Sequence, residues 1–191
     1  MSKKEKLLNY YKTELARMLS NVDFIPFFGI DVEKKIMLYS ELKNYGTIDD
    51  LFPKPNDYRI ILIESEPRSG HWCSIIKING NLIWFDSYGC FPDTELRFIS
   101  KIKNRLLGQT QNEIRRLMKG VEKIGLKAWY SKTKYQSESD NISTCGRWVA
   151  ISIHMLYELQ YSLAEMKIIF DRVKEDTGKP YDIIAVDFSS K

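Results

Sequence analysis

Residues 69–89, "SGHWCSIIKINGNLIWFDSYG", decide the fold and hold the first candidate functional residues. Two runs rich in β-branched and aromatic residues, 72–78 and 82–88, flank Asn79-Gly80. Asn-Gly between two such runs is the strongest short signal for a two-residue hairpin turn, because both residues tolerate positive φ. The stretch therefore predicts a tight antiparallel hairpin.

This turn also predicts which residues face each other across the hairpin. If Ile78 faces Asn81, then Cys73 faces Asp86, and His71 lies on the same face of the sheet as both. His71 and Asp86 become diagonal neighbours with β-carbons about 7 Å apart, a gap that an imidazole and a carboxylate can bridge. The pair fits a catalytic site, and it equally fits two surface residues of an ordinary hairpin.

Composition limits the class of protein. The chain has 191 residues, of which 43% are hydrophobic, so we expect a single domain over 1–191. Its net charge of +4 permits contact with nucleic acid without requiring it. Three cysteines provide neither a disulfide framework nor paired metal ligands. The charged N-terminus and the lack of an apolar run of about 20 residues predict a soluble intracellular protein that does not enter membranes.

Outside the hairpin, periodicity predicts a mixture of helices and strands and therefore an α+β domain. The stretch 132–143 is expected to be a polar loop. Helices are expected over 3–20, 32–43, 94–123 with a break near Gly108, 145–160 and 162–176, and further strands over 58–65, 125–131 and 181–188.

Cys145 in "ISTCGRWVAIS" is the candidate nucleophile. Ser143 or Thr144 can cap the helix that follows, which places the thiol at a helix N-terminus, where unpaired N–H groups and the helix dipole favour thiolate. Gly146 is expected to leave open space beside the sulfur. A small buried side chain without chemistry is the alternative, since free cysteines are often buried.

Only two histidines could serve this cysteine. His154 follows Cys145 by nine residues on the same helix, about 13 Å along its axis and on the opposite side, which excludes it as a base. His71 remains. Asp86 is expected to accept a hydrogen bond from Nδ1 of His71 and to leave Nε2 for the thiol.

"GHW", "WFDSYG", a glutamine and "TCGRW", in this order, resemble the cysteine proteases of the adenovirus protease and ubiquitin-like-protein protease group. The resemblance covers residues 70–150 and is greatest to the maturation proteases of virophages, large DNA viruses and Polinton-type elements. It implies a papain-like fold, in which helices flank a central mixed sheet and the nucleophile begins a buried helix. It also implies site roles: His71 as general base, Asp86 as its orienter, Gln136 as oxyanion donor, Cys145 as nucleophile and Trp72 as a wall of the substrate channel.

The loop before the nucleophile departs from the family pattern. Cys145 follows Gln136 by nine positions, where the family spacing is six or seven, so Asn141 or Ser137 could supply the oxyanion donor instead. A side-chain amide suits that role because it donates a hydrogen bond without titrating.

The resemblance implies a viral endopeptidase that cuts capsid or scaffold precursors at glycine-containing sites. Processing of a ubiquitin-like protein is the alternative, followed by a binding module without activity. No metal or cofactor is implied, and we expect a monomer in the host cytoplasm or nucleus, with packaging in the virion as an option. The basic segment 97–123 could contact DNA weakly, although a solvated helix face explains it as well.

Overall fold

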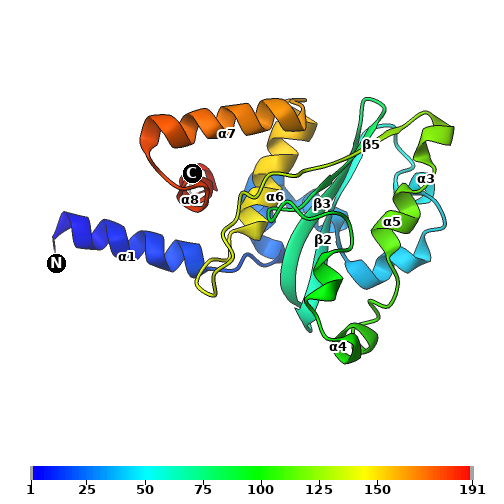
Figure 1. Cartoon of the computed structure of the whole chain (residues 1–191), viewed down its shortest axis with the longest axis horizontal. Helices are drawn as coiled ribbons and strands as arrows, with labels where there is room; N and C mark the ends of the chain where they lie inside the picture. The colour runs from blue at the N-terminus through cyan, green and yellow to red at the C-terminus, as the bar shows by residue number, and fades with distance from the viewer. Residues whose placement is uncertain (1, 190–191) are drawn as a thin grey trace.

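A five-stranded mixed sheet forms the centre of the molecule (Figure 1). The computed structural model describes residues 2–189. In spatial order the strands are β1 (Ile36–Leu38), β2 (Asp57–Glu66), β3 (Ser69–Ile78), β4 (Asn81–Phe85) and β5 (Lys127–Tyr130). The two outer pairs, β1 with β2 and β4 with β5, are parallel, and the inner pairs are antiparallel.

The hairpin of β3 and β4 has the predicted register. Ile78 pairs with Asn81 and Ser74 with Phe85, and the turn residues have φ of 47° at Asn79 and 73° at Gly80. Strand β4 ends at Phe85, so Asp86 lies at the first position beyond it. The carboxylate is therefore carried by a rigid strand end rather than by a free loop.

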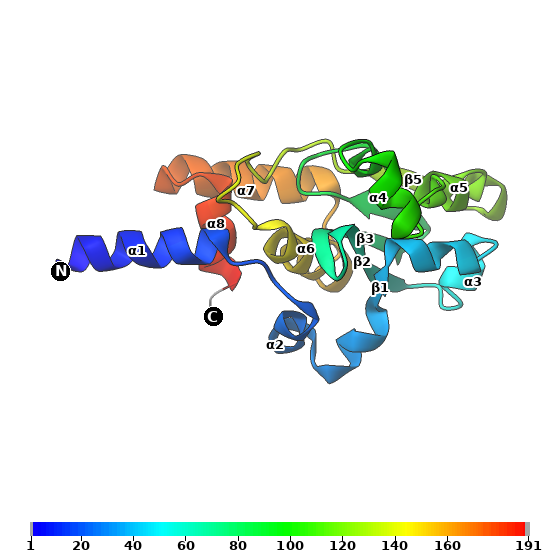
Figure 2. The same cartoon turned by 90° about the horizontal axis from the view of Figure 1, so that it is seen from below.

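Helices cover both faces of the sheet (Figures 1 and 2). One core contains Trp72 of β3, Phe85 of β4 and the fully buried Trp148. The other contains Ile75 and Trp84 from the opposite sides of the same strands. The helices are α1 (Lys3–Ala16), α2 (Ile25–Phe28), α3 (Ile48–Leu51), α4 (Lys101–Leu106), α5 (Glu113–Met118), α6 (Cys145–Ile153), α7 (Leu163–Thr177) and α8 (Tyr181–Ser189).

Several sequence predictions are confirmed within these elements. Helix α6 begins at Cys145 and every residue in it is buried, as its apolar circumference indicated. Gly108 adopts φ of 71° and separates α4 from α5, while Gly178, at φ of 66°, ends α7. Within residues 2–189, no helix combines the length and the apolar character that crossing a bilayer requires.

The prediction of a strand over 181–188 is wrong, because this segment is helix α8. Its run of isoleucine and valine resembles a buried strand, yet short apolar runs do not distinguish a strand from a buried helix. Pro180 precedes the first turn, where proline suits a helix, and α8 packs against α6 and α1.

The prediction of a helix over 32–43 is also wrong. Residues 30–35 and 39–44 form 3₁₀ turns on either side of β1, the strand that pairs with β2. The N-terminal helix ends at Ala16 rather than near residue 20, and none of its residues is buried. Figure 2 shows α1 leading away from the sheet with only its last part beside α8.

Candidate active site

The N-terminus of α6 places Cys145 beside the beginning of β3. Cys145 is only 8% exposed, and its sulfur accepts hydrogen bonds from the backbone N–H groups of Trp72 and Gly146. The predicted cap is wrong in detail. Thr144 occupies the N-cap position without capping the helix, because its hydroxyl donates to Asp182 at 2.5 Å, and the Ser143 N–H donates to the carbonyl of Leu15.

His71 and Asp86 form the diagonal pair that the hairpin predicted. Nε2 of His71 lies 2.9 Å from Oδ1 of Asp86, and the Tyr88 N–H donates to the same oxygen at 2.8 Å. The expectation that Nδ1 faces Asp86 is wrong. The far nitrogen, Nε2, bridges the gap to the next strand, while Nδ1 stays near the β3 backbone and is left for the hydrogen bond with Cys145.

Cys145, His71 and Asp86 form a trio in which each charged form stabilises that of its neighbour. Burial raises the pKa of the Cys145 thiol, but the hydrogen bond and the charge of His71, together with the N–H groups of Trp72 and Gly146, outweigh it and hold that pKa below its usual range. Burial lowers the pKa of His71, but the charge and the hydrogen bond of Asp86, together with the hydrogen bond to Cys145, raise it well above its usual range. The arrangement therefore favours a thiolate–imidazolium pair.

Gln136 reaches the same cleft and is almost fully buried. Its carbonyl accepts from Ser87 at 2.9 Å, and its Nε2 donates to Tyr88 Oη and to the Ile142 carbonyl, each at 3.1 Å. Both protons of the amide are thus engaged in this structure. The Tyr88 ring stacks on His71, with centroids 4.7 Å apart, so Tyr88 links Gln136 to the imidazole.

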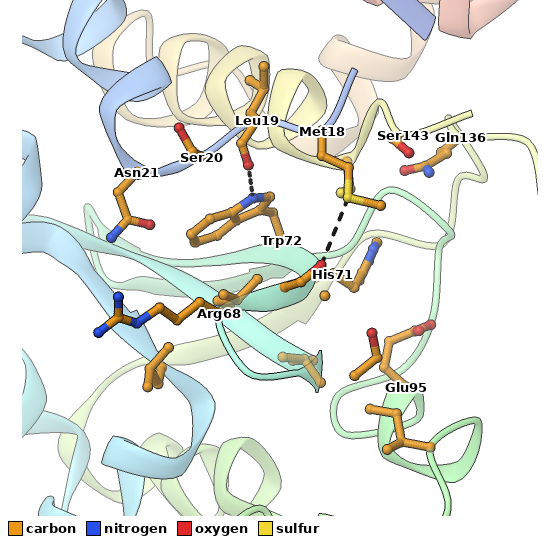
Figure 3. Close-up of a pocket in the computed structure, with 18 of the residues that line it drawn as sticks. Met18, Leu19, Ser20, Asn21, Arg68, His71, Trp72, Glu95, Gln136 and Ser143 are labelled. Atoms are coloured by element: carbon orange, nitrogen blue, oxygen red, sulfur yellow. Dashed lines mark hydrogen bonds between the residues drawn. The ribbon is translucent and has the colours of Figure 1, made fainter. Parts of the chain in front are cut away.

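A cleft of about 890 Å³ opens beside this trio (Figure 3). The segment 18–22, which follows α1, forms one wall, and the Trp72 indole donates to the carbonyl of Leu19 at 2.8 Å. The expectation of open space at Gly146 is wrong, because a β-carbon there would lie 2.9 Å from Cβ of Leu19. The absence of a side chain at Gly146 therefore allows Leu19 to pack closely against α6. Trp72 lines the cleft.

Two buried polar residues that the sequence did not single out support the start of α6. Asp182 of α8 accepts from the Thr144 hydroxyl at 2.5 Å and from the Ser137 N–H at 3.1 Å, so it connects both ends of the loop before Cys145. Arg147, 1% exposed, pairs with Glu14 of α1 and donates to Ser189 of α8. Aspartate and arginine are seldom fully buried, so the sequence contains no signal that these two residues support the site.

The second histidine and the other two cysteines are not part of this trio. His154 is exposed at the far end of α6 and pairs with Glu158, in agreement with its exclusion as a base. Cys73 lies within β3 and Cys90 after β4. Within residues 2–189, two groups of side chains could share a cation: one contains His71, Cys73 and Asp86, and the other Asp86, Cys90 and Glu95.

The basic segment 97–123 is only partly available for a partner. Lys103, Arg115 and Arg116 form ion pairs with acidic residues of the chain. Helix α4 also exposes Ile102 at 73% and Leu106 at 81%, so its surface is not uniformly cationic. Contact with DNA stays a prediction.

Comparison with known proteins places the chain among viral relatives. No known protein-family profile matches it, and no solved structure matches it. It is 32% identical, over 166 residues, to a Sputnik virophage protein that bears only the name uncharacterized protein V9, and the match covers 84% of this chain and 90% of that protein. The chain therefore belongs to the same family as this virophage protein.

Proposed function

We propose that the protein is a cysteine endopeptidase with a papain-like fold that uses Cys145, His71 and Asp86. The hydrogen-bonded series from thiol to imidazole to carboxylate, beside a cleft, carries this proposal. A nucleophile activated by a base, with the base oriented by a third group, is the common logic of covalent acyl transfer.

In the proposed reaction the Cys145 thiolate attacks the scissile carbonyl carbon and forms a tetrahedral intermediate. His71 donates its Nδ1 proton to the leaving amine, which departs and leaves a thioester on Cys145. His71 then removes a proton from water, and the resulting hydroxide attacks the thioester and releases the carboxylate product and the thiolate. Asp86 holds the ring through Nε2 during both steps.

The intermediate's oxyanion needs hydrogen-bond donors, each worth about 10²- to 10³-fold in rate. The N–H of Cys145 is one. Gln136 becomes the second only if its amide releases Tyr88 or Ile142. Asn141 is exposed on the same loop and remains an alternative, whereas the Ser137 N–H is already bound by Asp182.

The virophage relative supports a viral origin. Together with the resemblance to viral maturation proteases, it leads us to propose a capsid or scaffold precursor, cut at a glycine-containing site, as the substrate. Leu19 and Trp72 narrow the cleft next to Cys145, which suits a residue without a side chain before the scissile bond. A peptide library tests this directly. Internal cuts in precursor-derived peptides would support a maturation protease. Cleavage directly after a Gly-Gly sequence, which releases the residues that follow it, would point to a ubiquitin-like substrate.

The decisive experiment combines labelling and turnover. The protein is treated with a peptide electrophile ending in glycine, and mass spectrometry locates the adduct. We expect it on Cys145, with Cys145→Ala unlabelled and inactive, and His71→Ala slower by about 10²- to 10⁴-fold. His154→Ala is the matched control and should keep full activity.

Other outcomes would reject the assignment. An adduct on Cys73 or Cys90 would move the nucleophile. A folded protein that binds glycine-terminated peptides without cleaving them would instead indicate a binding module.

A further inference from the structure

A group of potential metal ligands lies next to the trio, on the loop that follows β4. Ligand atoms of Asp86, Cys90 and Glu95 all lie within 4.8 Å of one another. In a tetrahedral zinc site with bonds of about 2.0–2.3 Å, ligand atoms lie roughly 3.3–3.8 Å apart. The three side chains would therefore have to close by only about 1 Å to hold one ion.

An unpaired oxygen on one residue of this group supports the presence of a ligand. Asp86 is 1% exposed, and its Oδ2 has no hydrogen-bond partner, although Oδ1 accepts from His71 and Tyr88. A buried carboxylate oxygen without a partner costs folding free energy and calls for a bound water or ion. A cation would satisfy it directly.

The local charges point the same way. Two carboxyl groups and a thiol place their ligand atoms within 4.8 Å of one another, so their anionic forms would repel one another. A divalent ion removes that repulsion.

We propose that Asp86, Cys90 and Glu95 form a binding site for zinc. A thiolate with two carboxylates suits zinc rather than calcium or magnesium, which prefer oxygen ligands alone. Glu95 lines the cleft and provides the entry path, and water completes the coordination. On binding, the Cys90 thiol loses its proton to solvent and its sulfur bonds to the metal.

Occupancy of this site has a consequence for the trio, and this step rests on the proposed function. Asp86 is shared between the zinc site and His71, so a bound metal draws the carboxylate's charge away from the imidazole. The His71–Cys145 ion pair then loses its support, and zinc inhibits peptide cleavage. The metal acts as a regulator and not as a cofactor.

Cobalt titration of the Cys145→Ala protein tests binding without the competing thiolate. We expect one Co²⁺ per chain, with a thiolate-to-metal absorption band that Zn²⁺ abolishes on displacement. Cys90→Ser should remove the band, and Glu95→Gln should weaken binding by at least about 100-fold, more than is usual for residues outside the ligand shell. Cys73→Ala, a matched buried cysteine from the neighbouring group, should keep both band and affinity.

Two results would overturn the site. Unchanged Co²⁺ affinity in Cys90→Ser and Glu95→Gln would show that these residues bind no metal. Loss of the band in Cys73→Ala instead would assign the thiolate to the other group.

In the active protein, Zn²⁺ should inhibit cleavage and Cys90→Ser should relieve that inhibition. Absence of cleavage would count against the proposed function alone, since the Co²⁺ result does not depend on it.

Discussion

The hydrogen bond between Thr144 and Asp182 offers a stability test that needs no substrate. Thr144 is fully buried, and its hydroxyl donates to Asp182 at 2.5 Å. Thr144→Val keeps the shape of the side chain but removes the donor. The Asp182 carboxylate, 3% exposed, then loses one of its two partners and cannot replace it with bulk water.

The expected magnitude follows from the charge of the acceptor. Hydrogen bonds to charged groups contribute about 1.5–3 kcal/mol, and the buried position places this bond within that range. With a urea m-value of about 2 kcal/mol/M, the unfolding midpoint should fall by roughly 0.7–1.5 M. The matched control is Thr13→Val, because the Thr13 hydroxyl donates to the Asn9 carbonyl on the exposed face of α1. It should change stability by less than about 0.5 kcal/mol.

A double-mutant cycle separates this bond from simple loss of packing. If the bond exists, Thr144→Val should cost less in an Asp182→Ala background, because no buried carboxylate is left unpaired. Equal costs in both backgrounds, or a Thr144→Val midpoint that matches Thr13→Val, would refute the reasoning.

Three further predictions address the same region. Alkylation of Cys145 should continue at pH values below those that an ordinary thiol requires, because the lowered pKa of Cys145 keeps thiolate present there. In His71→Ala the reaction should require a higher pH, and identical pH profiles of the two proteins would contradict the ion pair. Gly146→Ala should destabilise the protein by about 1–3 kcal/mol because its new methyl group meets Cβ of Leu19. In a Leu19→Gly background, which lacks that Cβ, Gly146→Ala should cost much less in urea unfolding, and equal costs in both backgrounds would argue against the contact. Arg147→Met should loosen α1 and speed limited proteolysis near residue 17, whereas an unchanged cleavage rate would mean that the ion pair with Glu14 does not hold the helix.

The sequence predicted those parts of the fold that depend on short-range chemistry. Asn79-Gly80 fixes the hairpin register because only adjacent residues are involved, and the register in turn places His71 next to Asp86. The buried helix from Cys145 was equally predictable from its apolar circumference. Segment 181–188 was not, because its identity as helix depends on packing against α6, which local patterning does not encode.

The residues that hold the candidate nucleophile in place could not be predicted from the sequence for a related reason. Asp182 and Leu19 contact the start of α6 from opposite ends of the chain, and no spacing rule connects them to Cys145. The hydrogen bonds of Gln136 depend on the loop 132–143, whose path has no periodicity to indicate it. The choice of Nε2 over Nδ1 follows from the position of the thiol beside the β3 backbone, which only the folded chain defines.

These contacts divide the candidate site into two halves with different origins of stability. The His71–Asp86 half belongs to a hairpin whose register is local, so it forms whenever the central sheet forms. The Cys145 half depends on Leu19 and Asp182, residues contributed by the two ends of the chain. The two halves therefore depend on different parts of the chain. The position of His71 next to Asp86 follows from pairing between neighbouring strands, whereas the position of Cys145 depends on contacts with residues from both ends of the chain.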